Sequence, residues 1–515
     1  MSRSRQIMDI PGWLARCVIC YINLLRRRGP SPYHLVVPCT LLLPRINAMR
    51  IIIPALLVLV LAFIACDGPS STAEADGERK QEQPGVQESE DPIAAWHQQR
   101  AREFSTIDDL EPILEKASDR RLILLGEASH GTTEYYQWRA ELSLALAAGP
   151  GLDFVALEAD AHSVRAADQY VMGQGEVDEV EDLLRENFDR WPQWMWANAE
   201  FAEFLRNTRA YNQENPSRPL RIYGMDVFGF YDSIGQLNAL AERVHPEQAP
   251  ELAGHLNCLG QYGRDRESYA RALHNRRHSH QGHDHQDSDE TTCEAEIQRA
   301  FDLVMELFSE NEYDHILART HAHVVRAAEN QQRSRITHGN PATHWNARAR
   351  PMYEITEEIL TAKGDDARGA VWAHNTHLGD ARASRMGDQD QVNIGQLSRE
   401  SLGEDAVLSI GFSTYEGRVI AGSQWGAPLE IMEVPKGKED SLDEILHHLG
   451  PSNHFLIFEK EDRELPFFQE RPEQRAIGVV YNPARERFGN YVPTNPAARY
   501  DILIFLEKTE ELNPL

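Results

Sequence analysis

The stretch RLILLGEASHGTTEYYQWRAEL, residues 121–142, shows where a buried strand gives way to polar chemistry. The aliphatic run 122–125 is typical of a buried strand, and it stops at Gly126. Glu127 and His130 follow at once, and a helical pattern comes after them. Burying a charged group is costly, so we expect polar side chains at the end of such a strand to meet water or a ligand. This stretch therefore predicts the beginning of a functional site.

The same alternation of β-type runs and helical patterns continues along the chain. It is typical of an α/β fold with a mostly parallel sheet. Long helical patterns cover residues 197–211 and 295–332. We expect strands at residues 122–125, 154–157, 220–223, 370–373, 406–410, 455–458, 477–481 and 502–505.

The composition is that of a globular protein with an acidic surface. The chain has 515 residues, 41% of them hydrophobic, and its 80 acidic and 52 basic residues give a net charge of -28. This charge repels phosphate backbones and argues against nucleic acid as the partner. Four of the six cysteines lie within residues 1–66, and only Cys258 and Cys293 lie in the bulk of the chain, so we expect no disulfide scaffold.

The N-terminal part has the features of an export signal. Residues 49–68 read MRIIIPALLVLVLAFIACDG, whose apolar run is short for a bilayer span and suits the hydrophobic region of a signal peptide. Ala65 followed by Cys66 resembles the lipobox of bacterial lipoproteins. We therefore expect Cys66 to carry the lipid, the tethered protein to be exported to the periplasm or the cell surface, and an uncleaved membrane anchor as the alternative.

The chain divides into three parts. Residues 1–66 hold a basic extension and the signal peptide, and a translation start at Met49 is the simplest account of the extension. Residues 67–95 are acidic and polar, as expected of a disordered tether. Residues 96–515 form the folded domain, and their His-rich tract at 276–289 is interpreted as a solvated loop, with weak zinc or copper binding as the alternative.

Ionisable side chains follow four of the expected strands. Because ligands collect outside the carboxyl ends of parallel strands, these side chains are expected to converge. Each of them alone has a structural explanation, such as a helix cap, but their repetition indicates a catalytic cluster. The residues are Glu127 and His130 after the first strand, Glu158 after the second, Asp226 after the third, and His374 with Asn375 and His377 after the fourth.

The absence of several catalytic motifs limits the reactions that the sequence supports. The sequence contains no G-x-S-x-G nucleophile elbow, no H-E-x-x-H, no P-loop and no G-x-G-x-x-G after a strand. Histidines with carboxylates and no evident nucleophile favour hydrolysis by an activated water, with histidine as the general base. The same residues suit a divalent metal, and the sequence alone does not separate the two chemistries.

Several blocks together resemble the erythromycin esterase-like family. They occur in the family's order from about Ile123 to the C-terminus, and several blocks in order are more specific than any one of them. The blocks are LGEASHGTTEYY, FVALEAD, YGMDVFG, WNARARPM, VWAHNTHLGDAR, NIGQLSRE and IGVVYNP.

The resemblance implies a three-layer α/β/α domain with large helical insertions. It also implies hydrolysis of an ester, which is a macrocyclic lactone in the family's macrolide-resistance members. By its position in the family's G-E-x-x-H block, His130 is expected to be the base that deprotonates water, with Glu127 next to it. Arg139 is expected to position the substrate or to stabilise negative charge.

The remaining blocks supply the rest of the expected site. Glu158 is expected to orient a histidine or the water, while His374 and His377 are expected to hold the oxyanion or to protonate the departing alcohol. The expected substrate contacts are Asp226, Asn375 and Trp194. Ala349 and Asn490 depart from the family's usual aspartate and histidine, which puts the family's own substrate in doubt.

The preferred interpretation is a metal-independent hydrolase acting on a small-molecule ester. The first alternative is a divalent metal in the same site, as in relatives with a similar G-E-x-x-H block that are metal-dependent proteases. The second is a lipoprotein that binds haem or metal through His374, His377 and the His-rich tract.

Overall fold

The computed structural model of the protein describes residues 92–175, 179–262, 268–279, 292–337 and 340–515. The expected extension, signal peptide with Cys66, and tether up to residue 91 lie outside the described residues. Helix α2 (Pro92–Arg100) begins slightly before the domain boundary expected at Trp96. Among the described helices, none has the length and apolar character to cross a membrane.

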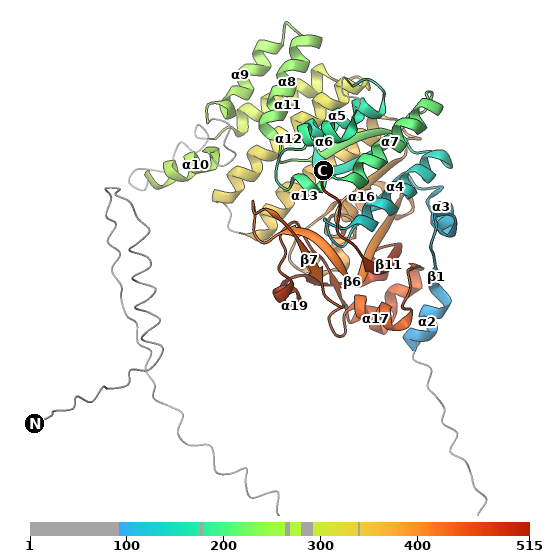
Figure 1. The fold of residues 1–515 in the computed structure, drawn as a ribbon. Coiled ribbons are helices and arrows are strands. Elements are labelled where there is room, and N and C mark those ends of the chain that lie inside the picture. The colour runs from blue at the N-terminus through green and yellow to red at the C-terminus, as the bar shows by residue number, and fades with distance from the viewer. Residues whose placement is uncertain (1–91, 176–178, 263–267, 280–291, 338–339) are drawn as a thin grey trace, which may run out of the picture. The chain divides into compact units, whose positions relative to one another are not determined.

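One large sheet organises the domain (Figure 1). Its nine strands run in the order β1-β8-β11-β6-β2-β5-β3-β4, with β7 paired to β6. The strands from β11 to β4 in this order are parallel, whereas β1, β7 and β8 pair in antiparallel fashion. The strands are β1 Ala101–Glu103, β2 Leu122–Leu125, β3 Phe154–Asp160, β4 Arg221–Asp226, β5 Gly369–Trp372, β6 Val407–Gly422, β7 Leu429–Val434, β8 His454–Ile457 and β11 Ile502–Thr509.

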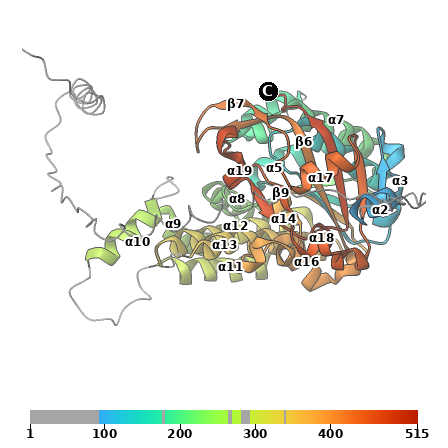
Figure 2. The same cartoon turned by 90° about the horizontal axis from the view of Figure 1, so that it is seen from below.

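Helices cover both faces of this sheet (Figures 1 and 2), which confirms the three-layer α/β/α arrangement. One face packs against α4 (Thr133–Ala148), α5 (Ala161–Val171), α6 (Val180–Asn187) and α7 (Ala199–Glu214). The other face carries the large helical insertion, formed by α8 Phe230–Val244, α9 Ala249–Gly260, α10 Ser268–Ser279, α11 Glu294–Leu307, α12 Tyr313–Thr337, α13 Pro341–Ala362 and α16 Ile394–Leu402.

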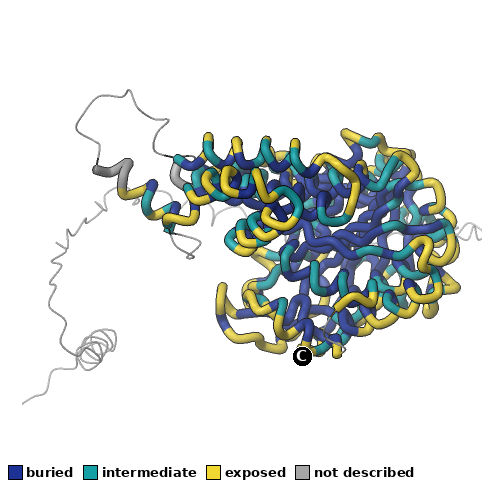
Figure 3. Tube along the Cα trace, turned by 90° about the horizontal axis from the view of Figure 1, so that it is seen from above, coloured by how far each residue is buried: buried dark blue, intermediate teal, exposed yellow. Residues whose placement is uncertain are grey.

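Strand β2 shows how the sequence builds the two layers. Its side chains alternate between opposite faces, as the pleat of a strand requires. Ile123 and Leu125 belong to the core under α4 and α7, while Leu122 and Leu124 belong to the core under the insertion. Burial is concentrated along the sheet between these layers (Figure 3). An uninterrupted aliphatic run is therefore the pattern of a strand that is covered on both sides.

Short elements complete the chain, and many of them lie around the C-terminal part. They are α3 Glu111–Ala117, α14 Asn375–Leu378, α15 Arg385–Asp388, α17 Leu442–Leu449, α18 Pro466–Gln469, α19 Glu486–Gly489, α20 Pro496–Arg499, and the 3-10 turns η1 Ile107–Leu110, η2 Gln193–Met195, η4 Ala381–Ala383, η5 Glu404–Ala406, η6 Lys460–Glu464 and η7 Pro483–Arg485. Strands β9 Glu473–Arg475 and β10 Tyr491–Pro493 form a separate two-stranded sheet.

Three sequence expectations differ from the structure. The expected strand at 477–481 makes only isolated bridges, Ile477 to Ser129 and Val480 to Gly422, because it crosses the ends of strands instead of running beside one. The expected helix at 295–332 is two helices, α11 and α12, separated by the polar residues 309–312. Residues 276–279 of the expected His-rich loop are the end of α10, and residues 280–289 lie outside the described residues.

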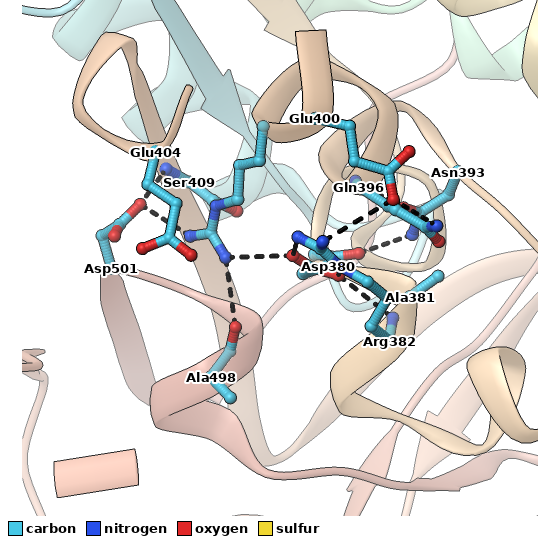
Figure 4. A network of polar contacts seen from close by, with 12 residues as sticks. Asp380, Ala381, Arg382, Asn393, Gln396, Glu400, Glu404, Ser409, Ala498 and Asp501 are labelled. Carbon is cyan, nitrogen blue, oxygen red and sulfur yellow. Dashed lines mark hydrogen bonds and ion pairs between the residues drawn. The ribbon is translucent and has the colours of Figure 1, made fainter. Parts of the chain in front are cut away.

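A polar network fixes the segment that follows β5 (Figure 4). The guanidinium of Arg399 donates to Asp501 at 2.9 Å and to Asp380 at 3.4 Å. Arg382 donates to the same oxygen of Asp380 at 2.7 Å and to the other oxygen at 3.0 Å. Asp380 lies two residues after the end of α14, so these contacts hold α14 and its histidine His377 against α16 and α20.

One disulfide joins two helices of the insertion. Cys258 in α9 and Cys293 at the start of α11 are bonded. We expected no disulfide scaffold, and in the described part of the chain this one bond is the disulfide present; no sequence pattern pointed to the pairing of these two cysteines. The bond reinforces the packing of α9 on α11.

Candidate active site

The four strands that end in ionisable groups are neighbours in the sheet. Their order is β2, β5, β3 and β4, and all four are parallel, so their carboxyl ends lie along one edge. The expected convergence of Glu127, His130, Glu158 and Asp226 is therefore observed. His130, Glu158 and Asp226 line the same pocket.

The loop after β2 forms the first part of the site. Gly126 is required there, because a Cβ atom would lie 2.2 Å from the side-chain oxygen of Asn375. Glu127 Oε1 accepts a hydrogen bond of 2.8 Å from His130 Nδ1. Its other oxygen lies 2.8 Å from a guanidinium nitrogen of Arg139, which is fully buried in α4. Glu127 thus orients the histidine and is itself held by a buried cation.

This environment makes His130 a suitable base. Burial alone lowers the pKa of an imidazole, but the hydrogen bond that His130 donates to Glu127 and the charges of Glu127 and Glu158 outweigh burial and raise the pKa of His130 above its usual value. Since Nδ1 carries the hydrogen that Glu127 accepts, Nε2 is the nitrogen left to take a proton.

Arg348 is the centre of the second part of the site. It projects from α13, and its guanidinium donates to Glu158 Oε1 at 2.7 Å and to Asp226 at 2.9 and 3.0 Å. It also donates to His377 Nε2 at 3.0 Å. Two strands, β3 and β4, and helix α14 are therefore connected through a single side chain.

These contacts set the charge of each partner. Burial raises the pKa of the Glu158 carboxyl, but His377, Arg348 and His130 outweigh it and hold that pKa well below its usual range. Burial likewise raises the pKa of Asp226, but Arg348 outweighs it and lowers the pKa. Burial lowers the pKa of His377 to about 4, so His377 is neutral and accepts from Arg348. Two carboxylates and one guanidinium thus remain charged beside the pocket.

The pocket has polar groups at its base and aromatic walls. Its volume is about 140 Å³. Asp160 and Arg190 form an ion pair of 2.6 Å within it. Burial raises the pKa of Asp160 despite this pair with Arg190. The remaining wall is largely apolar and comes from Phe188, Pro192, Met195, Trp196, Phe228, Trp425 and Val479.

Two of the expected catalytic residues support the pocket from behind. Arg139 does not line it, because its guanidinium is buried against Glu127 and the rings of Tyr136 and Trp372. His374 lies behind His130, with 5.0 Å between their ring centroids. Its Nε2 donates to the carbonyl of Ala128 at 3.2 Å. Neither residue lines the pocket, and the roles expected for them at the substrate stay predictions.

The other nitrogen of His374 is also engaged. Its Nδ1 accepts from the backbone N–H of Thr376 at 3.2 Å, which caps α14. Burial and the neighbouring His130 lower the pKa of His374 well below its usual range. His377 is similarly enclosed, since its ring stacks on Trp345 with 4.6 Å between centroids. Both histidines therefore serve as neutral scaffolding for the site.

Two expected substrate contacts also lie elsewhere. Asn375 uses its side-chain amide to bridge to β6, donating to the Phe412 carbonyl at 2.7 Å and accepting from the Phe412 N–H at 3.2 Å. Trp194 is buried in the core beneath α7 and does not line the pocket, while its neighbours Met195 and Trp196 do. Asp226 lines the pocket as expected, but both of its carboxylate oxygens are engaged with Arg348.

Sequence reasoning missed three charged residues of the pocket. Arg348 lies in the block WNARARPM, which we used only for the family resemblance. Asp160 is two positions beyond Glu158 on the same strand, so its side chain shares the face of Glu158. Arg190 lies between α6 and η2, in a stretch without a recognisable motif.

Several contacts of the described residues bear on the metal and haem alternatives. Arg348 already places a cation between Glu158, Asp226 and His377. Within the described part of the chain, the side chains close enough together to hold a metal ion are Glu310, Glu312 and His315, and none of them lines the pocket. Haem ligation would require an accessible imidazole nitrogen, and His374 has both of its nitrogens in hydrogen bonds.

Comparison with known proteins identifies the family. The model of the family described as erythromycin esterase matches residues 149–509. The chain belongs to the erythromycin esterase family. Membership indicates a hydrolase of the esterase type, as the sequence blocks predicted. The match begins after the block 121–142, so the pairing of Glu127 with His130 is a finding of the geometry.

Three solved structures share the fold of this family member. A Bacillus cereus protein is 17% identical with a TM-score of 0.66, and the alignment covers 82% of this chain and 98% of that one. A succinoglycan biosynthesis protein is 17% identical with a TM-score of 0.62, and the alignment again covers 82% of this chain and 98% of that one. A mutant of the erythromycin esterase EreC in its open conformation is 15% identical with a TM-score of 0.58. The alignment covers 80% of this chain and 98% of that one.

Proposed function

We propose that this protein hydrolyses an ester by direct attack of a water molecule that His130 deprotonates. The observation that carries the proposal is the position of His130. Its ring lines the pocket, while Nδ1 is held by Glu127, which leaves Nε2 to take the proton of water. A carboxylate partner also stabilises the imidazolium that forms during this step.

Arg348 is the group proposed to stabilise the developing negative charge. It is a permanently charged donor that lines the pocket, and Glu158 and Asp226 fix its position before the substrate arrives. Donors that need no reorganisation are the most effective at stabilising an oxyanion. Glu158 and Asp226 therefore act as positioning residues for Arg348.

The proposed reaction proceeds in two steps. The water oxygen forms a bond to the carbonyl carbon as its proton moves to Nε2 of His130, and the carbonyl oxygen becomes an oxyanion beside Arg348. The bond to the alcohol oxygen then breaks, and the imidazolium returns the proton to that oxygen. The products are a carboxylic acid and an alcohol, and His130 is neutral again.

The pocket volume limits how the substrate binds. Drug-sized ligands occupy pockets of about 300–1,000 Å³, whereas this one measures about 140 Å³. The ester group and the atoms next to it fit inside, and the bulk of a macrolactone or a similar large ester stays at the mouth beside Trp425.

We also propose that the enzyme works outside the cytoplasm, tethered through Cys66. The lipobox-like end of the apolar run at 49–66 carries this proposal. The disulfide between Cys258 and Cys293 supports it, because such bonds persist in oxidising compartments.

A mass-spectrometric screen tests the reaction. Purified protein is incubated with macrolactones and simple esters, with and without a chelator, and products that have gained one water are sought. The proposal expects such a product in both conditions and its loss in His130→Ala. Activity that disappears with the chelator and returns with a divalent ion would instead establish the metal-dependent alternative.

A further inference from the structure

The large hydrophobic side chains that are exposed gather in one region of the domain. Within the described residues they number five, their exposed fractions run from 38% to 88%, and all fall between positions 425 and 488. We call them the apolar rim: Trp425, Leu429, Ile431, Val480 and Phe488. Scattered apolar residues on a surface are ordinary, but their concentration in one region marks an interaction site.

Strand pairing places members of the rim side by side. Gly422 at the end of β6 pairs with Leu429 on one side and with Val480 on the other, so these two side chains share a face. Trp191 packs over the same glycine, where a Cβ would lie 3.0 Å from its ring. Trp425 contacts Trp191 with 4.6 Å between ring centroids. The hairpin of β6 and β7 therefore presents a connected apolar surface.

Phe488 extends this surface onto α19. Helix α19 follows η7, which packs against β7, and the two views show α19 beside β7 (Figures 1 and 2). Phe488 is flanked by the exposed Arg485 and Arg487. In the described part of the chain, neither arginine forms an ion pair with a carboxylate. Two cations beside an aromatic residue that is 88% exposed, on a protein of charge -28, suit a surface that carries phosphate groups.

The rim adjoins the mouth of the pocket. Trp425 belongs to both, because it lines the pocket and is 61% exposed. Val479, the neighbour of Val480, also lines the pocket. If the rim is docked on a surface, an apolar molecule that moves from that surface into the pocket would pass along the aromatic wall and reach His130.

We propose that the apolar rim docks onto a phospholipid bilayer, and that the enzyme takes an apolar, membrane-partitioned ester from that bilayer into the pocket. The substrate part of this inference rests on the proposed ester hydrolysis, whereas the docking part does not. Aromatic and aliphatic side chains enter the acyl region while Arg485 and Arg487 meet the lipid phosphates.

The chain between Cys66 and α2 is long enough for such docking. Its roughly 25 residues span about 80–90 Å when extended, and a domain of this size measures roughly 50–60 Å across. Helix α2 lies to the right of strand β7 in Figure 2, and the two elements are not adjacent there. A tether longer than the domain would allow the rim to face the bilayer wherever on the domain the tether is attached.

Quenching by brominated lipids tests the docking. The lipid-anchored protein is reconstituted into phosphatidylcholine vesicles, with and without phosphatidylglycerol, whose acyl chains carry bromine near the headgroup. Tryptophan fluorescence should be quenched in the wild type and much less in Trp425→Phe. The matched control Trp96→Phe, in α2, should be quenched as the wild type is. Equal quenching of wild type and Trp425→Phe would overturn the docking.

Activity tests the delivery of substrate. Ile431→Ser with Phe488→Ser should lower hydrolysis of a vesicle-borne long-chain ester about tenfold or more, and it should leave a water-soluble short ester unaffected. The conservative pair Ile431→Val with Phe488→Leu should behave as the wild type. An equal loss of activity on both esters would overturn the proposed delivery of substrate from the bilayer. A loss of activity that accompanies conversion of a dimer to a monomer would also overturn it, because the rim would then be the contact between two copies of the chain. If neither ester is cleaved, the proposed hydrolysis fails while the quenching result still stands.

Discussion

Nδ1 of His130 lies 2.8 Å from one oxygen of Glu127, and a guanidinium nitrogen of Arg139 lies 2.8 Å from the other oxygen. This chain of three residues has its cation fully buried and its histidine at the pocket. The histidine is therefore held in one tautomer and one orientation by groups that do not line the pocket. Its consequences can be tested by substitution.

Removing the base should abolish most of the activity without unfolding the protein. His130→Ala is expected to lower kcat by about 10²–10⁴-fold on the best ester found. The thermal unfolding midpoint should change little, because the ring borders a pocket. His255→Ala, in α9 and paired with Glu296, is the matched control and should retain full turnover. Full activity in His130→Ala would refute the assigned role.

In a profile of kcat/KM against pH, the fall on the acid side (the acid limb) should reflect the protonation of His130. The base works when neutral, so kcat/KM falls as the pH drops through its pKa, and the raised pKa places this limb above the ordinary value of 6.5. In Glu127→Gln the negative charge is lost, so the limb should move to lower pH. Activity near pH 7 should also fall sharply, because the amide can stabilise the wrong tautomer.

The experiment is a kcat/KM profile of both proteins over about pH 5 to 9. A limb that stays in place in Glu127→Gln would show that another group controls the profile. Arg139→Met provides a second comparison, since it leaves Glu127 present but without its buried cation.

Arg348 should matter to both stability and turnover. Arg348→Met leaves Glu158 and Asp226 buried without their cation, which typically costs about 3–5 kcal/mol of unfolding free energy. Urea unfolding measures the loss, and adding Asp226→Asn should restore part of it. Arg350→Met, an exposed arginine in the same helix, should have a negligible effect. A stable and fully active Arg348→Met would exclude this arginine from the site.

The packing of α2 should depend on pH. Nε2 of His97 in α2 lies 3.1 Å from Nε2 of His454 in β8, and both side chains are buried. Burial, with a contribution from His454, lowers the pKa of His97 to about 4. Because this pKa is lower in the folded state, the associated stability is present above pH 6.5 and is lost as the pH falls from 6.5 towards 4.

Unfolding free energies measured across that window should decline by about 3 kcal/mol in the wild type. The decline should be smaller in His97→Phe, which cannot be protonated. His448→Phe, in the exposed part of α17, should decline as the wild type does. Identical declines in His97→Phe and the wild type would assign the effect to other groups.

The sheet and the location of the site could be predicted from the sequence, because both follow from local patterns. Aliphatic runs mark strands covered on both faces, and the polar residues after them must collect where parallel strands end. The sequence pattern therefore placed Glu127, His130, Glu158 and Asp226 at one edge. None of these inferences depends on how the helices pack.

The direction in which each side chain points could not be predicted in the same way. Asn375 follows β5 just as His130 follows β2, yet it faces β6 because Gly126 leaves room for its amide. Arg348 reaches the site from a helix more than a hundred residues after β4 in the chain. Such contacts depend on the packing of elements that are distant in sequence, and a rule based on strand ends does not detect them.

The disulfide between Cys258 and Cys293 has a practical consequence for handling the protein. The His-rich tract lies in the sequence between these two cysteines. A protease that cuts within the tract would produce two fragments that remain covalently joined. They would migrate as one band on a gel without reductant and separate once it is added, so an apparently intact preparation should be checked under both conditions.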